Sequence, residues 1–374
     1  MKKALLVATV QSHICQFHKP LIEILKENNY EVHVAARNNL EEKNGLKLEN
    51  VDKVYDIPFS RSPVNVNNIK SYKVLKNIID ENKYDIITCN TPVGGIVTRL
   101  ASIKSRKSGS RVYYMAHGFH FYEGSPKKNW ILYYPIEKIM ANLTDVLITI
   151  TNEDYNLAKI KRFNTDICHV HGVGVSANKY NTISDEEKSR LRKKLGYKEN
   201  DYICICTGEL NKNKNQSTII ESIARVKEHI PNIKLLIAGN GSLDSELKCM
   251  VHNLEIDENV VFLGYTTDLD KYVKISDTVL TASFREGLPL NVIEAMLSGK
   301  PVIASNNRGH RELVKDAING YIVSPYDVDA YRKYILELKD GVKSENMGKK
   351  GLSLAKKFEV ECVKKELKEV YKLK

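Results

Sequence analysis

Residues that could bind an anion and a polyhydroxyl group gather in one short stretch, residues 283–309. An apolar run, 278–282, precedes it, and a polar loop containing Glu286 follows. Pro289 favours the start of a helix, because its missing N–H costs nothing in the first turn. The first N–H groups of a helix have no partner within it and form an anion site. Glu286 and Glu294 therefore flank a predicted anion site.

This combination suits a sugar nucleotide. The backbone N–H groups between Leu288 and Val292 are placed to hold a diphosphate, and carboxylates beside them can accept hydrogen bonds from sugar hydroxyls. Glu294 falls inside the predicted helix, where a carboxylate costs free energy unless it is hydrogen bonded. The other interpretation of Glu294 is a buried pair with a lysine or arginine. The neighbouring anion site favours the ligand-binding interpretation.

Two other loops follow predicted strands in the second half of the chain. The loop 208–215 carries Lys212 and Lys214, which could neutralise a diphosphate. Ligands bind at the carboxyl ends of strands in doubly wound sheets, so this position favours function over a solvated loop. Gly239 and Gly241 open the next turn but lack the third glycine of a dinucleotide fingerprint. A tight strand-to-helix turn explains this glycine pair equally well.

Histidines follow predicted strands in the first half. His117 and His120 lie in the loop after the fifth strand, and His13 is expected in the loop after the first. Histidines on loops that converge at one edge of a sheet favour a binding or catalytic site over a structural role. In such a site His117 could contact a sugar hydroxyl or a leaving phosphate. Metal binding by these histidines is disfavoured, because no acidic residue lies at a matching spacing. Two Asp-x-Asp motifs, 268–270 and 327–329, stand at predicted helix starts and are interpreted as caps.

Short apolar runs alternate with helical segments along most of the chain, which predicts α/β domains with parallel, doubly wound sheets. We expect a Rossmann-like domain over 1–170, a linker over 171–200 and a second Rossmann-like domain over 201–357. The C-terminal helix, about 358–374, is expected to pack back on the first domain. The expected strands are 4–10, 31–36, 54–57, 85–90, 112–115, 146–150 and 167–170, then 202–207, 234–238, 260–263, 278–282, 302–305 and 321–323.

Composition narrows the class of protein. The chain has 374 residues, a net charge of +11 and seven cysteines without a C-x-x-C pair, which indicates a reducing cytoplasm. No apolar run approaches the ~20 residues of a membrane span. The basic charge fits either a solvated lysine-rich surface or contact with an anionic membrane, whereas nucleic acid is disfavoured for want of any motif. The segment Trp130–Pro135 after Lys127 and Lys128 fits an interfacial patch or a core helix, and both remain open.

With these motifs the chain resembles the family 4 retaining glycosyltransferases of the GT-B type. The E-x7-E spacing within Glu286–Met296, the lysine loop, His117 and the two Rossmann-like halves carry the resemblance. The segments Ala116–Tyr122 and Tyr133–Glu137 resemble the branch that builds capsular and exopolysaccharides. The resemblance implies two domains facing across a cleft, no metal or other cofactor, and retention of anomeric configuration. It also implies a UDP-sugar donor such as UDP-GlcNAc, UDP-GalNAc or UDP-Gal.

The same resemblance assigns roles by position. Glu286 would bind the hydroxyls of the donor sugar, Glu294 the ribose, Lys214 the diphosphate, and His117 the transferred sugar. The remaining donor-site candidates are the amides of Leu290, Asn291 and Val292, together with Gly287, Gly239, Gly241 and Lys212. The acceptor would be a lipid-linked or growing saccharide bound by the first domain, with His13, His120 and Asn90 as acceptor-side candidates.

Three departures from the family pattern stand out. Glu209 replaces an arginine, which removes one phosphate contact that Lys212 is expected to compensate. Gln11, Ser12 and His13 stand in place of a glycine pair, and Asn90 stands where relatives often have histidine. The rival functions are a non-hydrolysing sugar-nucleotide epimerase and a non-catalytic sugar-nucleotide-binding subunit. The expected location is cytoplasmic, with peripheral contact to the inner face of the membrane as an open possibility.

Overall fold

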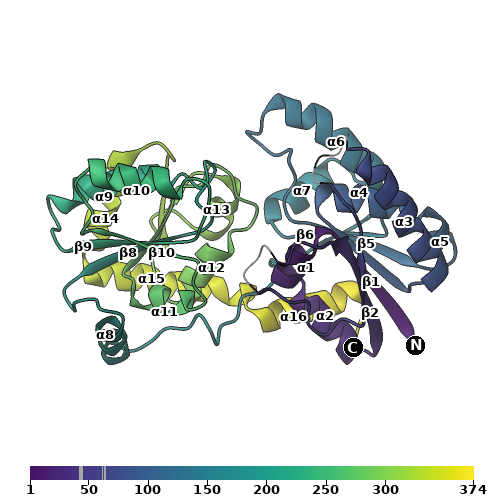
Figure 1. The fold of residues 1–374 in the computed structure, drawn as a ribbon, viewed down its shortest axis with the longest axis horizontal. Helices are drawn as coiled ribbons and strands as arrows, with labels where there is room; N and C mark the ends of the chain where they lie inside the picture. The colour runs from purple at the N-terminus through teal and green to yellow at the C-terminus, as the bar shows by residue number, and fades with distance from the viewer. Residues whose placement is uncertain (42–44, 61, 63–64) are drawn as a thin grey trace. The chain divides into compact units, whose positions relative to one another are not determined.

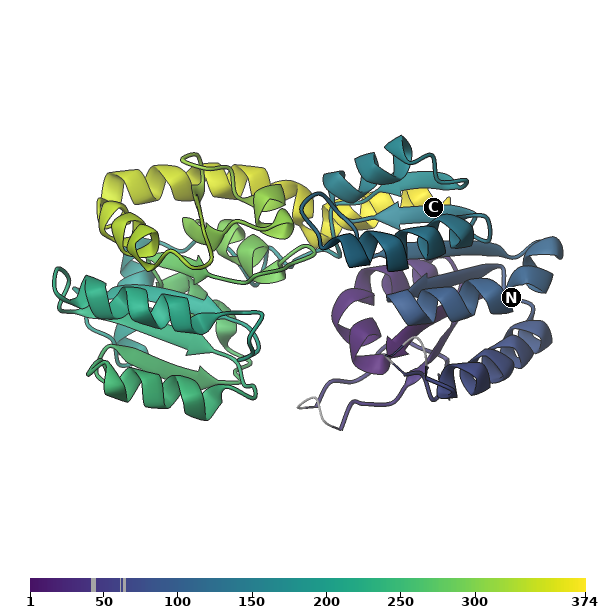
Figure 2. The same ribbon diagram turned by 90° about the horizontal axis from the view of Figure 1, so that it is seen from above.

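A computed structural model describes residues 1–41, 45–60, 62 and 65–374. The chain forms two compact units, each described here by itself (Figures 1 and 2). Unit 1 consists of Met1–Gly174 and Val360–Lys374, and unit 2 of Val175–Glu359. Each unit holds one parallel sheet covered by helices, so the α/β, doubly wound prediction is confirmed.

Unit 1 contains a seven-stranded sheet in the order β3-β2-β1-β4-β5-β6-β7. The order reverses between β1 and β4, and ligands bind beside such switch points at the carboxyl ends of the strands. The strands are β1 (Lys2–Val10), β2 (Tyr30–Arg37), β3 (Lys53–Asp56), β4 (Ile86–Asn90), β5 (Arg111–Ala116), β6 (Val146–Thr149) and β7 (Asp166–His169). The helices are α1 (Gln11–Phe17), α2 (Lys19–Glu27), α3 (Asn67–Asn82), α4 (Pro92–Ala101), α5 (Ile103–Lys107), α6 (Lys127–Ala141), α7 (Asn152–Ile160) and α16 (Val360–Tyr371).

The core of unit 1 explains why its strands read as apolar runs. Residues 4–8 of β1 are completely buried, because helices cover both faces of the sheet. On one face α3, α4, α6 and α7 contribute buried side chains to a single core. On the other, α16 packs against α2, and Tyr371 stacks on Tyr113 while its hydroxyl bonds the Thr88 hydroxyl at 2.8 Å. The C-terminal helix thus belongs to unit 1.

Unit 2 contains a six-stranded sheet in the order β10-β9-β8-β11-β12-β13, with its switch point between β8 and β11. The strands are β8 (Tyr202–Thr207), β9 (Ile233–Ala238), β10 (Val260–Gly264), β11 (Thr278–Thr281), β12 (Val302–Ser305) and β13 (Gly320–Val323). The helices are α8 (Asp185–Lys194), α9 (Gln216–Lys227), α10 (Asp244–Asn253), α11 (Leu269–Ile275), α12 (Leu290–Leu297), α13 (Arg308–Leu313), α14 (Val328–Leu338), α15 (Gly341–Ala355) and the 3-10 helix Lys356–Phe358. One core forms under α9, α10 and α14, and another under α11, α12 and α15.

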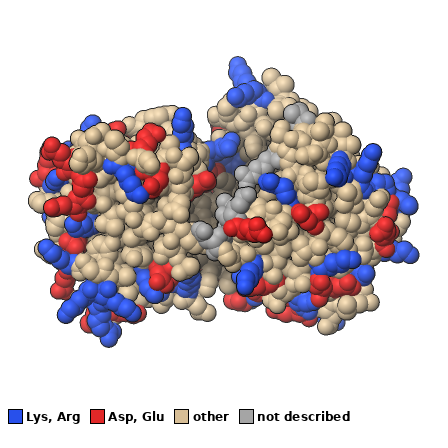
Figure 3. Space-filling view, viewed as in Figure 1, with Lys and Arg blue, Asp and Glu red and all other residues tan. Residues whose placement is uncertain are grey.

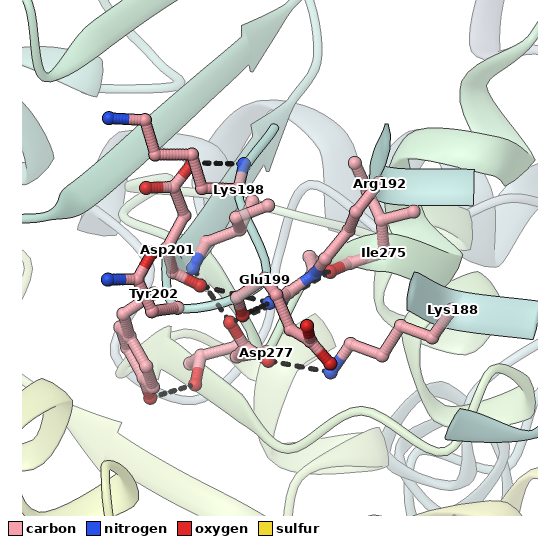
Figure 4. Close-up of polar contacts among 12 residues, drawn as sticks. Lys188, Arg192, Lys198, Glu199, Asp201, Tyr202, Ile275 and Asp277 are labelled. Atoms are coloured by element: carbon pink, nitrogen blue, oxygen red, sulfur yellow. Dashed lines mark hydrogen bonds and ion pairs between the residues drawn. The ribbon is translucent and has the colours of Figure 1, made fainter. Parts of the chain in front are cut away.

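Helix α8 is fastened to unit 2, although the sequence placed residues 171–200 in a separate linker. The Arg192 guanidinium, only 6% exposed, donates to the carbonyls of Ile275, Glu199 and Asp201 and to the Asp277 carboxylate (Figure 4). Burial alone would raise the pKa of Asp277, but the charges of Lys188 and Arg192 hold it below its usual value. This network places α8 against the amino ends of β8 and β11, where it belongs to unit 2.

No helix among the described residues combines the length and apolar character needed to cross a bilayer.

Candidate functional site

Two glycine turns meet at the carboxyl ends of β8 and β9. Gly239 has φ +140°, and a Cβ added there would lie 2.0 Å from the Gly208 carbonyl oxygen. A Cβ on Gly241 would lie 2.2 Å from the Leu210 carbonyl oxygen. Only glycine allows this approach of backbone to backbone, so the glycine pair does more than close a turn. It holds the 208–210 loop at the switch point.

The lysine loop and the acidic loop are joined at this switch point. The Lys214 ammonium contacts the Glu286 carboxylate at 2.7 Å, and its stem lies on Gly208, whose added Cβ would be 3.1 Å from Lys214 Cε. The Phe284 N–H donates to the Asn213 carbonyl at 2.8 Å, which fixes one loop against the other. Lys212, by contrast, is exposed. The structure therefore brings Lys214 and Glu286 together and leaves Lys212 outside this pair.

Helix α12 points its first turn toward the same place. It begins at Leu290, with Pro289 as the extended N-cap residue, one position later than the sequence suggested. The side-chain amide of Asn291 donates to the Thr207 carbonyl at the end of β8 (3.2 Å), so the helix start is tied to the switch point. The Val292 N–H already donates to the Pro289 carbonyl (3.2 Å), which makes the amides of Leu290 and Asn291 the better anion donors of the three.

Glu294 lies one turn further along α12, in a partly buried position. Burial raises its pKa to about 7, against a smaller lowering by a hydrogen bond from the Tyr180 hydroxyl and by the charge of Lys179. Asp270 nearby adds to the increase. Among the described residues the side chain that bonds this carboxyl is a tyrosine and not a lysine or arginine, so the alternative of a buried ion pair is not found there. Near neutral pH Glu294 can thus exchange a proton when its surroundings change.

Helix α13 supplies a further part of this site, and its residue His310 was not predicted from the sequence. A Cβ on Gly309 would lie 2.5 Å from the Gly287 carbonyl oxygen, so α13 packs directly on the acidic loop. His310 is completely buried and its Nδ1 lies 2.8 Å from the Ser305 carbonyl oxygen, while burial lowers its pKa to about 4. Both ring nitrogens of this neutral histidine have hydrogen-bond partners, Ser305 and Thr281, so its position is fixed beside the loop that carries Glu286. Gly309, the last residue of the stretch 283–309, was the signal in the sequence for this contact.

Unit 1 holds a separate cluster of histidines beside its own switch point. His13 lies in α1, not in a loop as the sequence suggested, because β1 passes directly into the helix. Its ring centroid is 4.6 Å from that of His117, which follows β5, and 5.3 Å from that of His18. His18, which precedes α2, is 1% exposed and was not predicted. The topology thus joins three histidines from two distant segments.

The electrostatics of this cluster favour neutral rings. Burial lowers the pKa of His117 to about 4, and burial followed by the charge of His117 holds the pKa of His18 well below its usual value. The Nε2 atoms of His117 and His18 are buried without a hydrogen-bond partner among the described residues. One potential ligand atom from each of His13, His18 and His117 lies within 4.8 Å of the others, so these residues could hold a metal ion. A sugar hydroxyl that donates to one imidazole would satisfy the same atoms.

The two other acceptor-side candidates differ in their placement. Asn90, at the end of β4, is fully buried; its amide donates to the Val7 carbonyl at 3.3 Å, and its Oδ1 has no partner among the described residues. His120 lies against α6 instead, with its ring 4.6 Å from that of Tyr133, and it is not part of the three-histidine cluster.

Comparison with known proteins supplies the family. Residues 187–353 match the family described as glycosyl transferases group 1, and residues 3–152 match the glycosyl transferase 4-like family. The putative glycosyltransferase EpsD of Bacillus subtilis is 39% identical over 372 residues, covering 99% of this chain and 96% of the relative. The UDP-Gal:alpha-D-GlcNAc-diphosphoundecaprenol alpha-1,3-galactosyltransferase of Escherichia coli is 30% identical, over 74% of this chain and 71% of that enzyme.

Solved structures share the fold. Anabaena HepE in complex with UDP and glucose superposes with a TM-score of 0.77 at 21% identity, over 100% of both chains. Sucrose-phosphate synthase from Thermosynechococcus elongatus gives a TM-score of 0.75 at 17% identity, over 100% of this chain and 98% of that one. At these identities the likeness shows the fold alone, which is the GT-B arrangement of two Rossmann-like domains.

Proposed function

This chain belongs to the glycosyltransferases, with a group 1 half and a 4-like half, and we propose that it is a retaining, metal-independent hexosyltransferase that uses a UDP-sugar. UDP-GlcNAc, UDP-GalNAc and UDP-Gal are the donors proposed. The acceptor proposed is a lipid-linked or growing saccharide of capsule, exopolysaccharide or another cell-surface glycan.

One observation supports donor binding in this proposal. The switch point of unit 2 brings a lysine, a helix start and two glutamates together beside the glycine turns at Gly208 and Gly239. Lys214 supplies a full positive charge, and the amides of Leu290 and Asn291 supply partial ones. These groups offset part of the negative charge of a diphosphate, which is the basis for proposing that no metal ion is required. The Glu286 carboxylate pairs with the Lys214 ammonium at 2.7 Å, so a diphosphate bound to Lys214 replaces or shares this ion pair.

The roles proposed for the two glutamates follow from their surroundings. Glu286, beside Lys214, accepts hydrogen bonds from hydroxyls of the donor sugar. Glu294, inside α12 and bonded by Tyr180, accepts them from the ribose. His117 of unit 1 is proposed to contact the transferred sugar, and its neutral ring suits a hydrogen bond with a hydroxyl.

The reaction proposed is a front-face displacement. An acceptor hydroxyl oxygen forms a bond to the anomeric carbon as the bond from that carbon to the diphosphate oxygen breaks. The hydroxyl proton passes to the departing phosphate oxygen on the same face, so configuration is retained and UDP leaves with the electron pair. Lys214 and the α12 amides stabilise the charge that develops on the diphosphate, as preorganised donors do.

Two relatives support the substrates proposed. The name of the Escherichia coli relative specifies a UDP-Gal donor and a diphosphoundecaprenol-linked acceptor, and its 30% identity extends over 71% of that enzyme. HepE was solved with UDP and glucose and has the same fold.

The test is titration of UDP by calorimetry in the presence of EDTA, with Lys214→Ala and Lys212→Ala as a matched pair. Binding is expected without metal, weakened about tenfold or more in Lys214→Ala, since a charged hydrogen bond contributes about 1.5–3 kcal/mol. The exposed Lys212 is expected to change affinity less than threefold. An equal loss of UDP affinity in both variants would contradict the proposed diphosphate site at Lys214. A strict need for Mg²⁺ or Mn²⁺ would contradict metal independence.

Turnover by the purified chain distinguishes the rival functions. Incubation with UDP-sugar and a lipid-diphosphate saccharide is expected to yield a product heavier by one hexose or N-acetylhexosamine, with the donor's anomeric configuration by NMR. Conversion of UDP-sugar without any acceptor would favour the epimerase. UDP binding without turnover on any panel member would favour a non-catalytic subunit.

A further inference from the structure

Helix α6 of unit 1 is apolar on both of its faces, which is unusual for a helix on the surface of a domain. Its inner face, with Glu137, Met140 and Ala141 buried, packs on the sheet. Its outer face presents Ile131, Leu132 and Ile139 to solvent at 77%, 53% and 60% exposure, and Pro135 between them is also exposed. These positions share one side of a helix, so they form a continuous apolar stripe.

Basic residues surround this stripe. Lys127 and Lys128 are exposed at the start of α6. Ile160, 75% exposed, and the exposed Lys161 and Arg162 lie at the end of α7; the Lys138 ammonium of α6 donates to the carbonyls of Lys161 and Arg162. The Lys161 ammonium lies 5.5 Å from the Trp130 ring centroid. Figure 3 shows basic side chains beside uncharged surface at the upper end of unit 1, where α6 lies in Figure 1.

Two acidic side chains near α6, Glu137 and Asp145, are already paired with arginines and do not offset this charge. Glu137 points inward, where its carboxylate pairs with the buried Arg99 guanidinium at 3.0 Å and accepts from the Tyr114 hydroxyl at 3.2 Å. Asp145, just beyond the helix, is paired with Arg106 at 2.7 Å. Glu123, in the loop before the helix, is exposed. The Arg99–Glu137 pair also fixes the rotation of α6, so that the apolar stripe faces outward.

We propose that the outer face of α6, the stripe Ile131, Leu132, Pro135 and Ile139 with its basic rim, docks on the surface of an anionic lipid bilayer. An apolar stripe rimmed by lysine and arginine is the chemistry of an interfacial helix, whose side chains enter the headgroup region while the basic groups meet lipid phosphates. At 15 residues, α6 is too short to span the hydrocarbon core and lies along the interface instead. The buried inner face agrees with the core-helix interpretation of this segment, and the proposed docking assigns the interfacial interpretation to its outer face.

The inner face of α6 connects this surface to the histidine loop. The Asn129 side chain donates to the His120 carbonyl at 2.9 Å, and the Trp130 indole N–H donates to the Tyr122 carbonyl at 3.2 Å. These two hydrogen bonds therefore hold the loop that follows His117 against the first turn of α6. Docking would present this loop at the lipid surface, where the saccharide of a lipid-linked acceptor emerges. This consequence for the acceptor rests on the proposed function, whereas the docking surface itself does not.

The test is sedimentation with large unilamellar vesicles of phosphatidylcholine and phosphatidylglycerol at 7:3, compared with phosphatidylcholine alone. The informative variant is Ile131→Ser/Ile139→Ser, and the matched control is Ile69→Ser/Ile318→Ser, which changes two exposed isoleucines outside α6. The α6 pair is expected to weaken binding to anionic vesicles about tenfold or more, and the control pair less than twofold. Lys127→Glu/Lys128→Glu is expected to weaken it about tenfold or more, with a loss that shrinks at high salt.

Three results would overturn the proposal: equal binding to both kinds of vesicle, wild-type binding by Ile131→Ser/Ile139→Ser, or a dimer in solution that this variant dissociates while vesicle binding is absent. UDP affinity separates the two proposals. In Ile131→Ser/Ile139→Ser it is expected to equal that of the wild type, which also reports correct folding, while transfer to a vesicle-embedded lipid-linked acceptor falls. Vesicle binding by a chain that does not bind UDP would leave the docking surface standing and refute the proposed function.

Discussion

Replacing Glu294 by glutamine is expected to stabilise the protein at alkaline pH and not at acidic pH. Burial raises the pKa of the Glu294 carboxyl from an ordinary 4.5 to about 7, so the native state holds this proton more tightly than the unfolded chain. A folded-state pKa above the unfolded one means that stability falls as pH rises from about 4.5 to about 7. Glutamine is neutral throughout and can still accept the hydrogen bond from Tyr180.

The magnitude follows from the same two pKa values. A difference of about 2.5 units corresponds to about 3 kcal/mol at pH 8, because each unit is worth about 1.4 kcal/mol. Below pH 4.5 both states are protonated and the wild type carries no penalty at this site. For a unit of this size, 3 kcal/mol corresponds to a rise of about 6 to 12 °C in Tm.

The assay is thermal unfolding of wild type and Glu294→Gln at pH 5 and pH 8, followed by circular dichroism without ligand. The control is Glu246→Gln on α10, an exposed glutamate whose replacement is expected to change Tm by less than about 2 °C at either pH. A Tm difference for Glu294→Gln that is the same at both pH values would refute the reasoning. At pH 8 the stabilised variant is also expected to bind UDP more weakly, because glutamine accepts fewer ribose hydroxyls than a carboxylate.

Three further perturbations test the architecture. Gly239→Ala is expected to destabilise unit 2 by about 2 kcal/mol or more, because its Cβ would lie 2.0 Å from a backbone oxygen, whereas Gly341→Ala, with open space around it, should be neutral or stabilising in urea unfolding. Glu209→Arg, which restores the charge usual in the family, is expected to tighten UDP binding about fivefold at low salt by calorimetry; unchanged affinity would contradict it. Arg192→Leu is expected to cost about 3–5 kcal/mol in urea, since it removes one of the two cations paired with Asp277 and leaves three carbonyls without their guanidinium donor, while the folded variant should keep its UDP affinity.

The positions of the strands along the chain could be predicted from the sequence because they depend on local patterns. All thirteen expected strands are present within about two residues of their predicted bounds, since strands buried on both faces leave unbroken apolar runs. Both glycine turns and the acidic loop follow β-strands, so their place at the carboxyl edges also followed from the sequence. The error at His13 has the same origin: nothing local marks a β-strand that passes into a helix without a turn.

Other features were decided by tertiary structure, because they join residues far apart in the chain. His18 meets His117 only because the sheet order places β1 and β4 side by side with β5 next to them, and a histidine before a helix gives no such sign. The Lys214–Glu286 pair spans 72 positions, and the outward stripe on α6 depends on the buried Arg99–Glu137 pair that sets the rotation of the helix. Sequence periodicity records which backbone segments are buried, whereas strand order and packing decide which side chains meet.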